Sequence, residues 1–139
     1  MNVLEADGLG KRYGRSWALR DCTLAIPSGH VVALVGPNGA GKTTLLHQAV
    51  GLSSPSAGSI RVLGGLAAGS APALERIGFV AQDAALYGGL SVAGMLRLTH
   101  DLNRRWDEPW ARQRMRELEI PLERKVGRLS GGQHAQVAL

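Results

Sequence analysis

The chain has 139 residues, of which 45% are hydrophobic and 19% charged, enough for one domain with a hydrophobic core. No stretch approaches the ~20 consecutive apolar residues that a membrane-spanning helix needs, and the first residues, MNVLEADGL, do not form a secretory signal. The single cysteine, Cys22, excludes an internal disulfide and a cysteine-based metal cluster. We expect it to be a small hydrophobic residue of the core.

The net charge of +5 and the isoelectric point near 10.1 raise the question of a nucleic-acid partner. The arginines, however, are interspersed with acidic residues, as in RRWDEPWARQRMRELEIPLERK, and form no continuous basic run. This pattern is typical of solvated helix surfaces. We therefore expect no nucleic-acid partner.

The first half of the chain predicts strands around one helix. Residues 4–14 combine strand character with a glycine-flanked turn, and residues 19–26 alternate in hydrophobicity as a half-buried strand does. The apolar run VVALV, residues 31–35, predicts a buried strand. A helix is expected to follow the glycine-rich segment and to end at Gly51.

Two more short strands and then helices are expected further along. Residues 60–63 and 77–81 predict strands, the second ending at Gln82. Residues 90–101 and 107–119 predict helices, with Asp107 as the cap of the second.

Helical periodicity also predicts buried positions in the second of these helices. Ala111, Met115 and Leu118 fall on one side of it. Trp106 and Trp110 are four residues apart, and we expect both to pack against the rest of the domain.

The segment VGPNGAGKTT fits the phosphate-binding pattern G-x-x-x-x-G-K-[ST] through Gly36, Gly41, Lys42 and Thr43. Glycines allow positive φ angles and bring successive N–H groups close to one anion. The helix that follows adds its free N-terminal donors and the positive end of its dipole. The alternative is a glycine-rich turn between a strand and a helix. The candidate binding residues are Gly36, Pro37, Asn38, Gly39, Ala40, Gly41, Lys42, Thr43 and Thr44.

A second motif, LSGGQ, occupies residues 129–133. Its serine hydroxyl and the N–H groups of two glycines at a helix start form another arrangement suited to an anion. By itself it could be a capped turn. With residues 36–43 in the same chain, chance is no longer a serious explanation.

These two motifs make the chain resemble the nucleotide-binding domain of an ATP-binding cassette (ABC) transporter over nearly all of its length. The resemblance implies an α/β fold of the P-loop NTPase class, with an N-terminal antiparallel β portion and an inserted α-helical subdomain. Residues 1–82 would form the β portion and the nucleotide-binding core, and residues from about 83 to 130 the helical subdomain. The core sheet is expected to be incomplete.

The resemblance also implies roles for individual residues. Tyr13, in the family's A-loop position, would stack on the adenine of ATP, although it could be an ordinary buried tyrosine. Lys42 and Gln82 would be the catalytic residues in this chain, and Thr43 and Gln82 would bind Mg²⁺. The signature residues, which would contact an ATP molecule held by a partner domain, are Ser130, Gly131, Gly132 and Gln133.

The implied partners are a second ABC ATPase domain, paired head to tail, and separate transmembrane permease subunits. The protein would then be cytoplasmic and peripheral on the inner face of the plasma membrane. Residues 105–125 resemble cassettes of simple exporters, which favours export. The transported substrate is not indicated.

The sequence departs from the family pattern at His134 and Gln136, where the family usually has basic residues. The family's Walker B aspartate, catalytic glutamate and switch histidine do not occur within residues 1–139. We therefore expect an N-terminal fragment that does not hydrolyse ATP efficiently by itself, because this chemistry uses a residue that orients or activates the attacking water.

Three other functions remain open from the sequence. The first is a non-transport ABC ATPase that acts on ribosomes or DNA. The second is a small P-loop kinase or GTPase, which nucleotide preference would distinguish. The third is a non-catalytic regulator built on the same fold.

Overall fold

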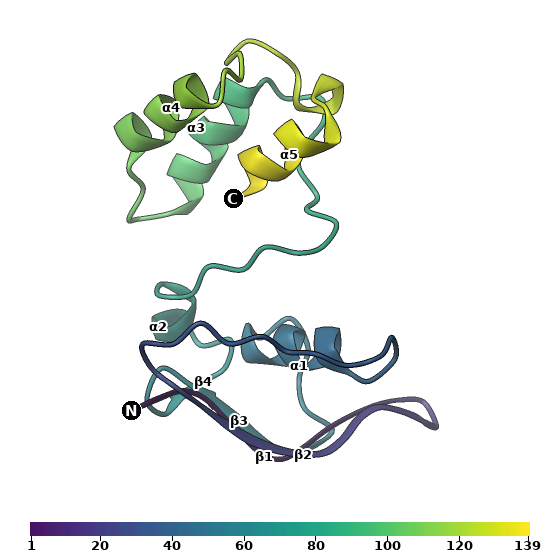
Figure 1. The fold of residues 1–139 in the computed structure, drawn as a ribbon. Helices are drawn as coiled ribbons and strands as arrows, with labels where there is room; N and C mark the ends of the chain where they lie inside the picture. The colour runs from purple at the N-terminus through teal and green to yellow at the C-terminus, as the bar shows by residue number, and fades with distance from the viewer. The chain divides into compact units, whose positions relative to one another are not determined.

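The computed structural model describes all residues from 1 to 139 and contains two compact units, Met1–Phe79 and Val80–Leu139 (Figure 1). Each unit is described by itself. No helix in either unit is both long and apolar enough to cross a lipid bilayer.

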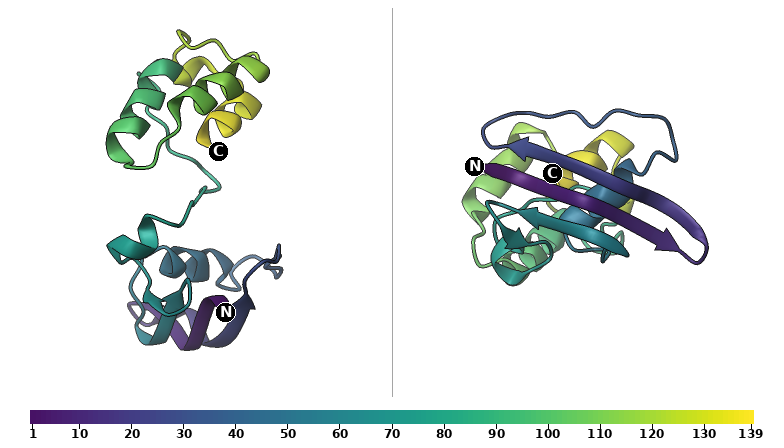
Figure 2. Two further views of the ribbon diagram at one scale, coloured as in Figure 1. Left: turned by 90° about the vertical axis from the view of Figure 1, so that its left-hand side faces the viewer. Right: turned by 90° about the horizontal axis from the view of Figure 1, so that it is seen from below.

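The first unit is built on a four-stranded antiparallel sheet with the strand order β2-β1-β3-β4 (Figure 2). Its strands are β1 (Asn2–Tyr13), β2 (Ser16–Pro27), β3 (Ala57–Val62) and β4 (Leu66–Ala67). Strand β1 lies in the centre, where Leu4 pairs with Ile26 of β2 on one side and with Val62 of β3 on the other.

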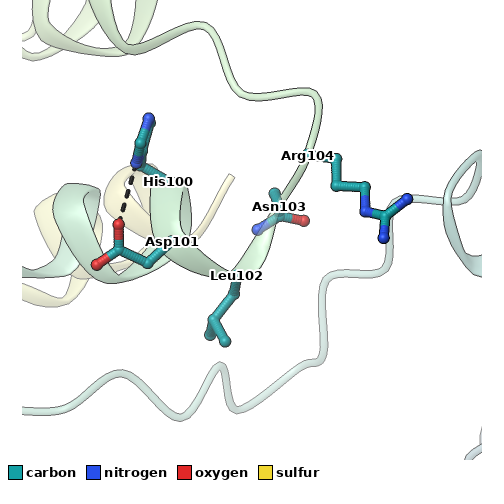
Figure 3. A pocket seen from close by; sticks show the side chains of 5 residues that line it. All are labelled: His100, Asp101, Leu102, Asn103 and Arg104. Atoms are coloured by element: carbon teal, nitrogen blue, oxygen red, sulfur yellow. Dashed lines mark hydrogen bonds and ion pairs between the residues drawn. The ribbon is translucent and has the colours of Figure 1, made fainter.

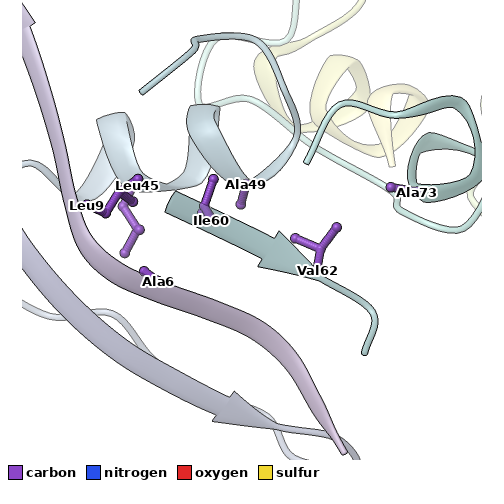
Figure 4. Close-up of a cluster of buried hydrophobic side chains, with 7 residues drawn as sticks. All are labelled: Ala6, Leu9, Leu45, Ala49, Ile60, Val62 and Ala73. Atoms are coloured by element: carbon purple, nitrogen blue, oxygen red, sulfur yellow. The ribbon is translucent and has the colours of Figure 1, made fainter. Parts of the chain in front are cut away.

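Helix α1 (Lys42–Ala49) packs on one face of this sheet and forms the core with it. Figure 4 shows Leu45 and Ala49 of the helix close to Ile60 and Leu9 of the strands. In β3, buried Ile60 and Val62 alternate with exposed residues, as expected of a strand with one buried face. The single-turn helix α2 (Ala71–Leu74) adds the fully buried Ala73.

Cys22 packs at the edge of this core, as its sequence context predicted. Burial raises the pKa of the Cys22 thiol above its usual value. The thiol therefore stays neutral over a wider pH range than that of an exposed cysteine.

The second unit is helical. It contains α3 (Val92–Leu102), α4 (Glu108–Glu117), the 3-10 helix η1 (Val126–Arg128) and α5 (Gly131–Ala138). Ser91 caps α3 by accepting the Gly94 N–H at 3.0 Å, and Asp107 caps α4 by accepting the Trp110 N–H at 2.9 Å. The core of this unit consists of Val92, Leu96, Ala111, Met115, Ile120 and Val126.

Most of the local predictions are confirmed. The strand at 19–26 lies within β2, and the strand at 60–63 largely coincides with β3. Helix α1 ends just before Gly51, which has a φ of 76°. The helices expected at 90–101 and 107–119 are α3 and α4.

The strands predicted at residues 31–35 and 77–81 are wrong. Neither segment is a strand, and Val31 and Val35 are strongly exposed, at 104% and 87% of their full accessible surface. A strand requires neighbouring backbone groups to complete its hydrogen bonds, and none of the four strands pairs with either segment.

The expectation for the two tryptophans is half right. Trp106 packs against the core of the second unit, whereas Trp110 is 60% exposed. The spacing of four residues does not place them on one side of a helix, because Trp106 precedes the cap residue Asp107.

Gln48 of α1 is a polar residue in the core of the first unit, with only 1% of its surface exposed. Its Oε1 has no hydrogen-bond partner, and its Nε2 lies 3.5 Å from the Gly10 carbonyl oxygen. That oxygen already accepts the Ser56 N–H at 2.8 Å. The Gln48 amide therefore costs stability and contributes little in return.

We predict that Gln48→Leu raises the free energy of unfolding by about 1–2 kcal/mol, because it removes an unpaired buried carbonyl and leaves no acceptor unsatisfied. Urea denaturation followed by circular dichroism measures the change. The exposed control Gln136→Leu should stay within about 0.5 kcal/mol of the parent. A loss of stability in Gln48→Leu would show that the long amide bond to Gly10 is needed.

Candidate functional site

The glycine-rich segment, residues 36–41, is a loop that leads directly into α1. A hydrogen bond from the Ala40 N–H to the Pro37 carbonyl oxygen, 3.2 Å long, closes a turn in this loop. Gly39 and Gly41 have φ angles of 85° and 95°, in the left-handed region that side chains disfavour. These two glycines therefore allow the backbone of the loop to adopt this conformation.

Gly41 is also fixed by close packing against β2. A Cβ atom at this position would lie 2.6 Å from the Ala18 carbonyl oxygen and 2.9 Å from Leu19 Cδ1, whereas one at Gly39 would meet nothing within 4 Å. Ala18 is an extra residue in its strand, because Lys11 pairs with Leu19 while the next residue, Arg12, pairs with Trp17. The start of α1 thus packs against a bulge in β2.

The first turn of α1 offers unpaired hydrogen-bond donors. The Leu45 N–H donates to the Gly41 carbonyl at 2.9 Å. The N–H groups of Lys42, Thr43 and Thr44 precede this bond and have no acceptor within the helix. The cap residue Gly41 provides no side-chain acceptor, and the first turn has no acidic residue. This helix start is suited to an external anion.

The side chain of Lys42 lies along the loop. Its Nζ donates to the carbonyl oxygens of Gly36 at 2.6 Å and Pro37 at 2.7 Å. An ammonium group has three N–H donors, so one remains for a ligand. Neither these bonds nor the contact with Ala18 was foreseen, because the sequence pattern gives residue types and not their contacts within the loop.

Tyr13 lies at the end of β1 and is 57% exposed, so it is not an ordinary buried tyrosine. The Nζ of Lys11 is 5.2 Å from the centre of its ring and donates to the Ser54 carbonyl at 2.7 Å. This cation–π contact holds a cation close to an aromatic ring with free surface. Tyr13 belongs to the same unit as the loop.

The other predicted site residues belong to the second unit. Gln82 is exposed in a turn near its start. Ser130 caps α5: its Oγ accepts the Gln133 N–H, and Gln133 Oε1 accepts the Ser130 N–H, both at 3.2 Å. This reciprocal capping box was not predicted, although serine followed by glutamine three residues later is its known sequence signal.

The residues around the loop fit a phosphate with its Mg²⁺ better than a metal bound by protein alone. No group of three or more histidine, cysteine, aspartate or glutamate side chains comes together in the chain. The Thr43 side chain, in the first turn of α1, offers an oxygen ligand, which Mg²⁺ prefers, and Mg²⁺ is commonly bound through few protein ligands together with substrate phosphates. Gln82, the other predicted ligand, belongs to the other unit.

The second unit also contains a hollow. It has a volume of about 510 Å³ at the end of α3 and is lined by His100, Asp101, Leu102, Asn103 and Arg104 (Figure 3). The only bond between these side chains joins His100 Nδ1 to Asp101 Oδ1 at 3.1 Å. All five residues are exposed, and none belongs to the predicted site.

Comparison with known sequences identifies the family. The sequence profile described as "ABC transporter" matches residues 19–139, which include both the loop and the LSGGQ motif. The chain belongs to the ABC transporter family.

Curated relatives within this family are ATP-binding proteins of import systems. The chain is 40% identical to "Fe(3+) ions import ATP-binding protein FbpC 2" of Rhodococcus jostii over 99% of its own length and 41% of that protein. It is 39% identical to "Sulfate/thiosulfate import ATP-binding protein CysA 2" of Chromobacterium violaceum over 98% of its length and 38% of that protein. The chain thus spans about two fifths of these relatives. Their names conflict with the expectation of an exporter.

Solved structures agree on the fold. An ATP-binding subunit of an ABC transporter matches with a TM-score of 0.81 and 27% identity, over 98% of this chain and 59% of that one. A dimeric bacterial ABC transporter cassette matches with a TM-score of 0.79 and 25% identity, over 97% and 66%. The ABC chain therefore has part of the P-loop NTPase fold, with the antiparallel sheet and helical portion that its motifs implied.

The packing of Gly41 yields a prediction about stability. Gly41→Ala should lower the free energy of unfolding by about 3–5 kcal/mol, because it combines a left-handed φ with a clash against β2. Gly39→Ala is the matched control, since it has a similar φ and open space, and should cost about 1–2 kcal/mol.

Urea denaturation of the two variants measures the difference. Equal losses would mean that backbone conformation alone requires glycine at both positions. In that case the contact with the Ala18 carbonyl would not constrain the start of α1.

Proposed function

We propose that this chain is the nucleotide-binding part of an ATP-hydrolysing subunit of an ABC importer. The observation that carries the proposal is the uncapped start of α1, where the N–H groups of Lys42, Thr43 and Thr44 have no acceptor in the helix and follow a glycine loop. These donors suit the negative charge of a nucleoside triphosphate.

Residues 36–44 form the phosphate site in this proposal. The backbone of the loop would hold the β-phosphate, and the remaining N–H of the Lys42 ammonium group would donate to a β- or γ-phosphate oxygen. The two bonds from Lys42 to its own loop keep the ammonium group in place before the nucleotide arrives. Because the groups are positioned in advance, less conformational entropy is lost on binding.

The base and the metal involve residues outside the loop. The exposed ring of Tyr13 stacks on adenine, a role that aromatic rings fill without sequence-specific hydrogen bonds. The Thr43 hydroxyl and the Gln82 side-chain oxygen would be ligands for Mg²⁺. Lys42 and Gln82 are the residues that this chain contributes to hydrolysis. ATP bound with Mg²⁺ supplies the phosphoanhydride bond whose hydrolysis drives transport.

Ser130, Gly131, Gly132 and Gln133 act on a different nucleotide. In the proposed head-to-tail pair, they contact the γ-phosphate held by a second ABC ATPase domain. The capping box supports this role, because it fixes the start of α5 while the Gly131 and Gly132 backbones remain exposed. Closure and reopening of the pair would move separate transmembrane permease subunits.

The direction of transport is proposed from the relatives. The curated proteins named above import ferric ions or sulfate and thiosulfate. We therefore favour import of a small inorganic ion by a complex at the inner face of the plasma membrane, with this subunit on the cytoplasmic side.

We predict that the chain binds Mg²⁺–ATP and that Lys42→Ala raises the dissociation constant about tenfold or more, because a charge-assisted hydrogen bond to phosphate is lost. Fluorescence titration with a methylanthraniloyl derivative of ATP measures the affinity. Lys125→Ala, which removes an exposed lysine of the second unit, is the control with the same charge change. Equal affinities of the two variants would contradict the assignment of the loop.

Import is tested in cells that make the protein. We expect the subunit to sediment with membranes, and Lys42→Ala to reduce uptake of labelled ferric ion or labelled sulfate at least severalfold, because transport depends on the nucleotide. Sedimentation with ribosomes would instead indicate a non-transport ABC ATPase. If cells with Lys42→Ala lost a preloaded solute more slowly than cells with the parent protein, and took up both ions at the same rate, the result would indicate export.

A further inference from the structure

The sheet of the first unit has a second face, opposite α1, that carries an exposed tryptophan. A Cβ atom at Gly10 would lie 2.8 Å from Trp17 Cζ3 and 3.5 Å from Ala57 Cβ, so Trp17 covers Gly10 beside Ala57. Gly10 directly follows Leu9, which is fully buried in the core, and neighbouring residues of a strand point to opposite faces. Trp17 therefore lies on the outer face of the sheet, away from α1.

Two arginines stand against this tryptophan. The guanidinium carbons of Arg12 and Arg20 lie 5.6 Å and 5.8 Å from the centre of the Trp17 ring, and Arg12 pairs with Trp17 across the strands. Trp17 is 39% exposed, and both arginines are exposed. We call Arg12, Trp17 and Arg20 the outer cluster.

The charges of the outer cluster are not compensated. The ion pairs of the chain join His100 to Asp101, Arg112 to Glu108 and Arg114 to Glu117, all in the second unit. Asp21 is adjacent to Arg20 in sequence and forms no ion pair with it. Arg15, in the turn between β1 and β2, adds a third unpaired cation nearby.

Two like charges next to one ring repel each other, and a bound anionic group would relieve that repulsion. The indole also provides apolar surface beside the charges. Tryptophan and arginine are the residue types that most often dominate protein–protein interfaces. Guanidinium groups bind carboxylates with two parallel hydrogen bonds.

We propose that the outer cluster is a docking site for an acidic segment of a partner protein, with carboxylates on Arg12 and Arg20 and an apolar group against Trp17. Charge complementarity favours this partner. Single-stranded nucleic acid fits less well, because its bases stack on a series of free aromatic rings, whereas here the cluster has one ring with two guanidinium groups against it.

An NMR titration of the nucleotide-free chain with blocked hexaglutamate peptide tests the proposal at low salt. The Nε–H signals of Arg12 and Arg20 and the indole N–H of Trp17 should shift saturably, with the indole signal assigned by its loss in Trp17→Phe. The double variant Arg12→Gln/Arg20→Gln should raise the dissociation constant about fivefold or more, because both carboxylate partners are lost.

Arg76→Gln, which removes an exposed arginine elsewhere in the first unit, is the control and should change the dissociation constant by less than about twofold. Similar shifts at all exposed arginines would overturn the proposal. Tighter binding of oligo-dT of equal charge than of hexaglutamate would indicate a nucleic-acid partner in place of an acidic protein. Because the titration uses the nucleotide-free chain, neither outcome depends on ATP binding.

Discussion

The bulge at Ala18 is the constraint on which the first unit depends. One extra residue in β2 directs Leu19 toward the core and Trp17 toward the outer face, and it brings the Ala18 carbonyl against Gly41. Because glycine has no side chain at position 41, α1 can begin directly beside the sheet. From that start, Leu45 and Ala49 reach the core, so one irregularity sets both the packing of the helix and the place where its free N–H groups lie.

Both motifs are held in shape by bonds within the chain. Lys42 bridges the Gly36 and Pro37 carbonyls, and Ser130 and Gln133 bond each other reciprocally. In each case hydrogen-bonding capacity is left over: one ammonium N–H in Lys42, and the hydroxyl proton of Ser130. A ligand can therefore use groups that are already positioned, which reduces the ordering that binding requires.

The sequence predicted features whose cause is local. Asp107 and the glycines of residues 36–41 act through their own backbone conformation or the adjacent turn, so their types indicate their roles. The run at 31–35 has the composition of a buried strand, but strand formation depends on a partner elsewhere in the chain. Gln48 shows the opposite case: it occupies a buried position one turn after Leu45, and its residue type gave no sign of this burial.

The residues of the two proposed sites lie on opposite faces of β1. Lys11 pairs with the core-facing Leu19 and contacts Tyr13, whereas Arg12 pairs with the outward-facing Trp17. Neighbouring residues of a strand point to opposite faces, so adjacent cations in this strand serve different surfaces. Substitutions that remove the Arg12 or Arg20 guanidinium groups can therefore change the outer cluster while the side chains that contact Tyr13 and the loop remain. This division would allow the proposed nucleotide site and the proposed docking surface to change independently within one small sheet.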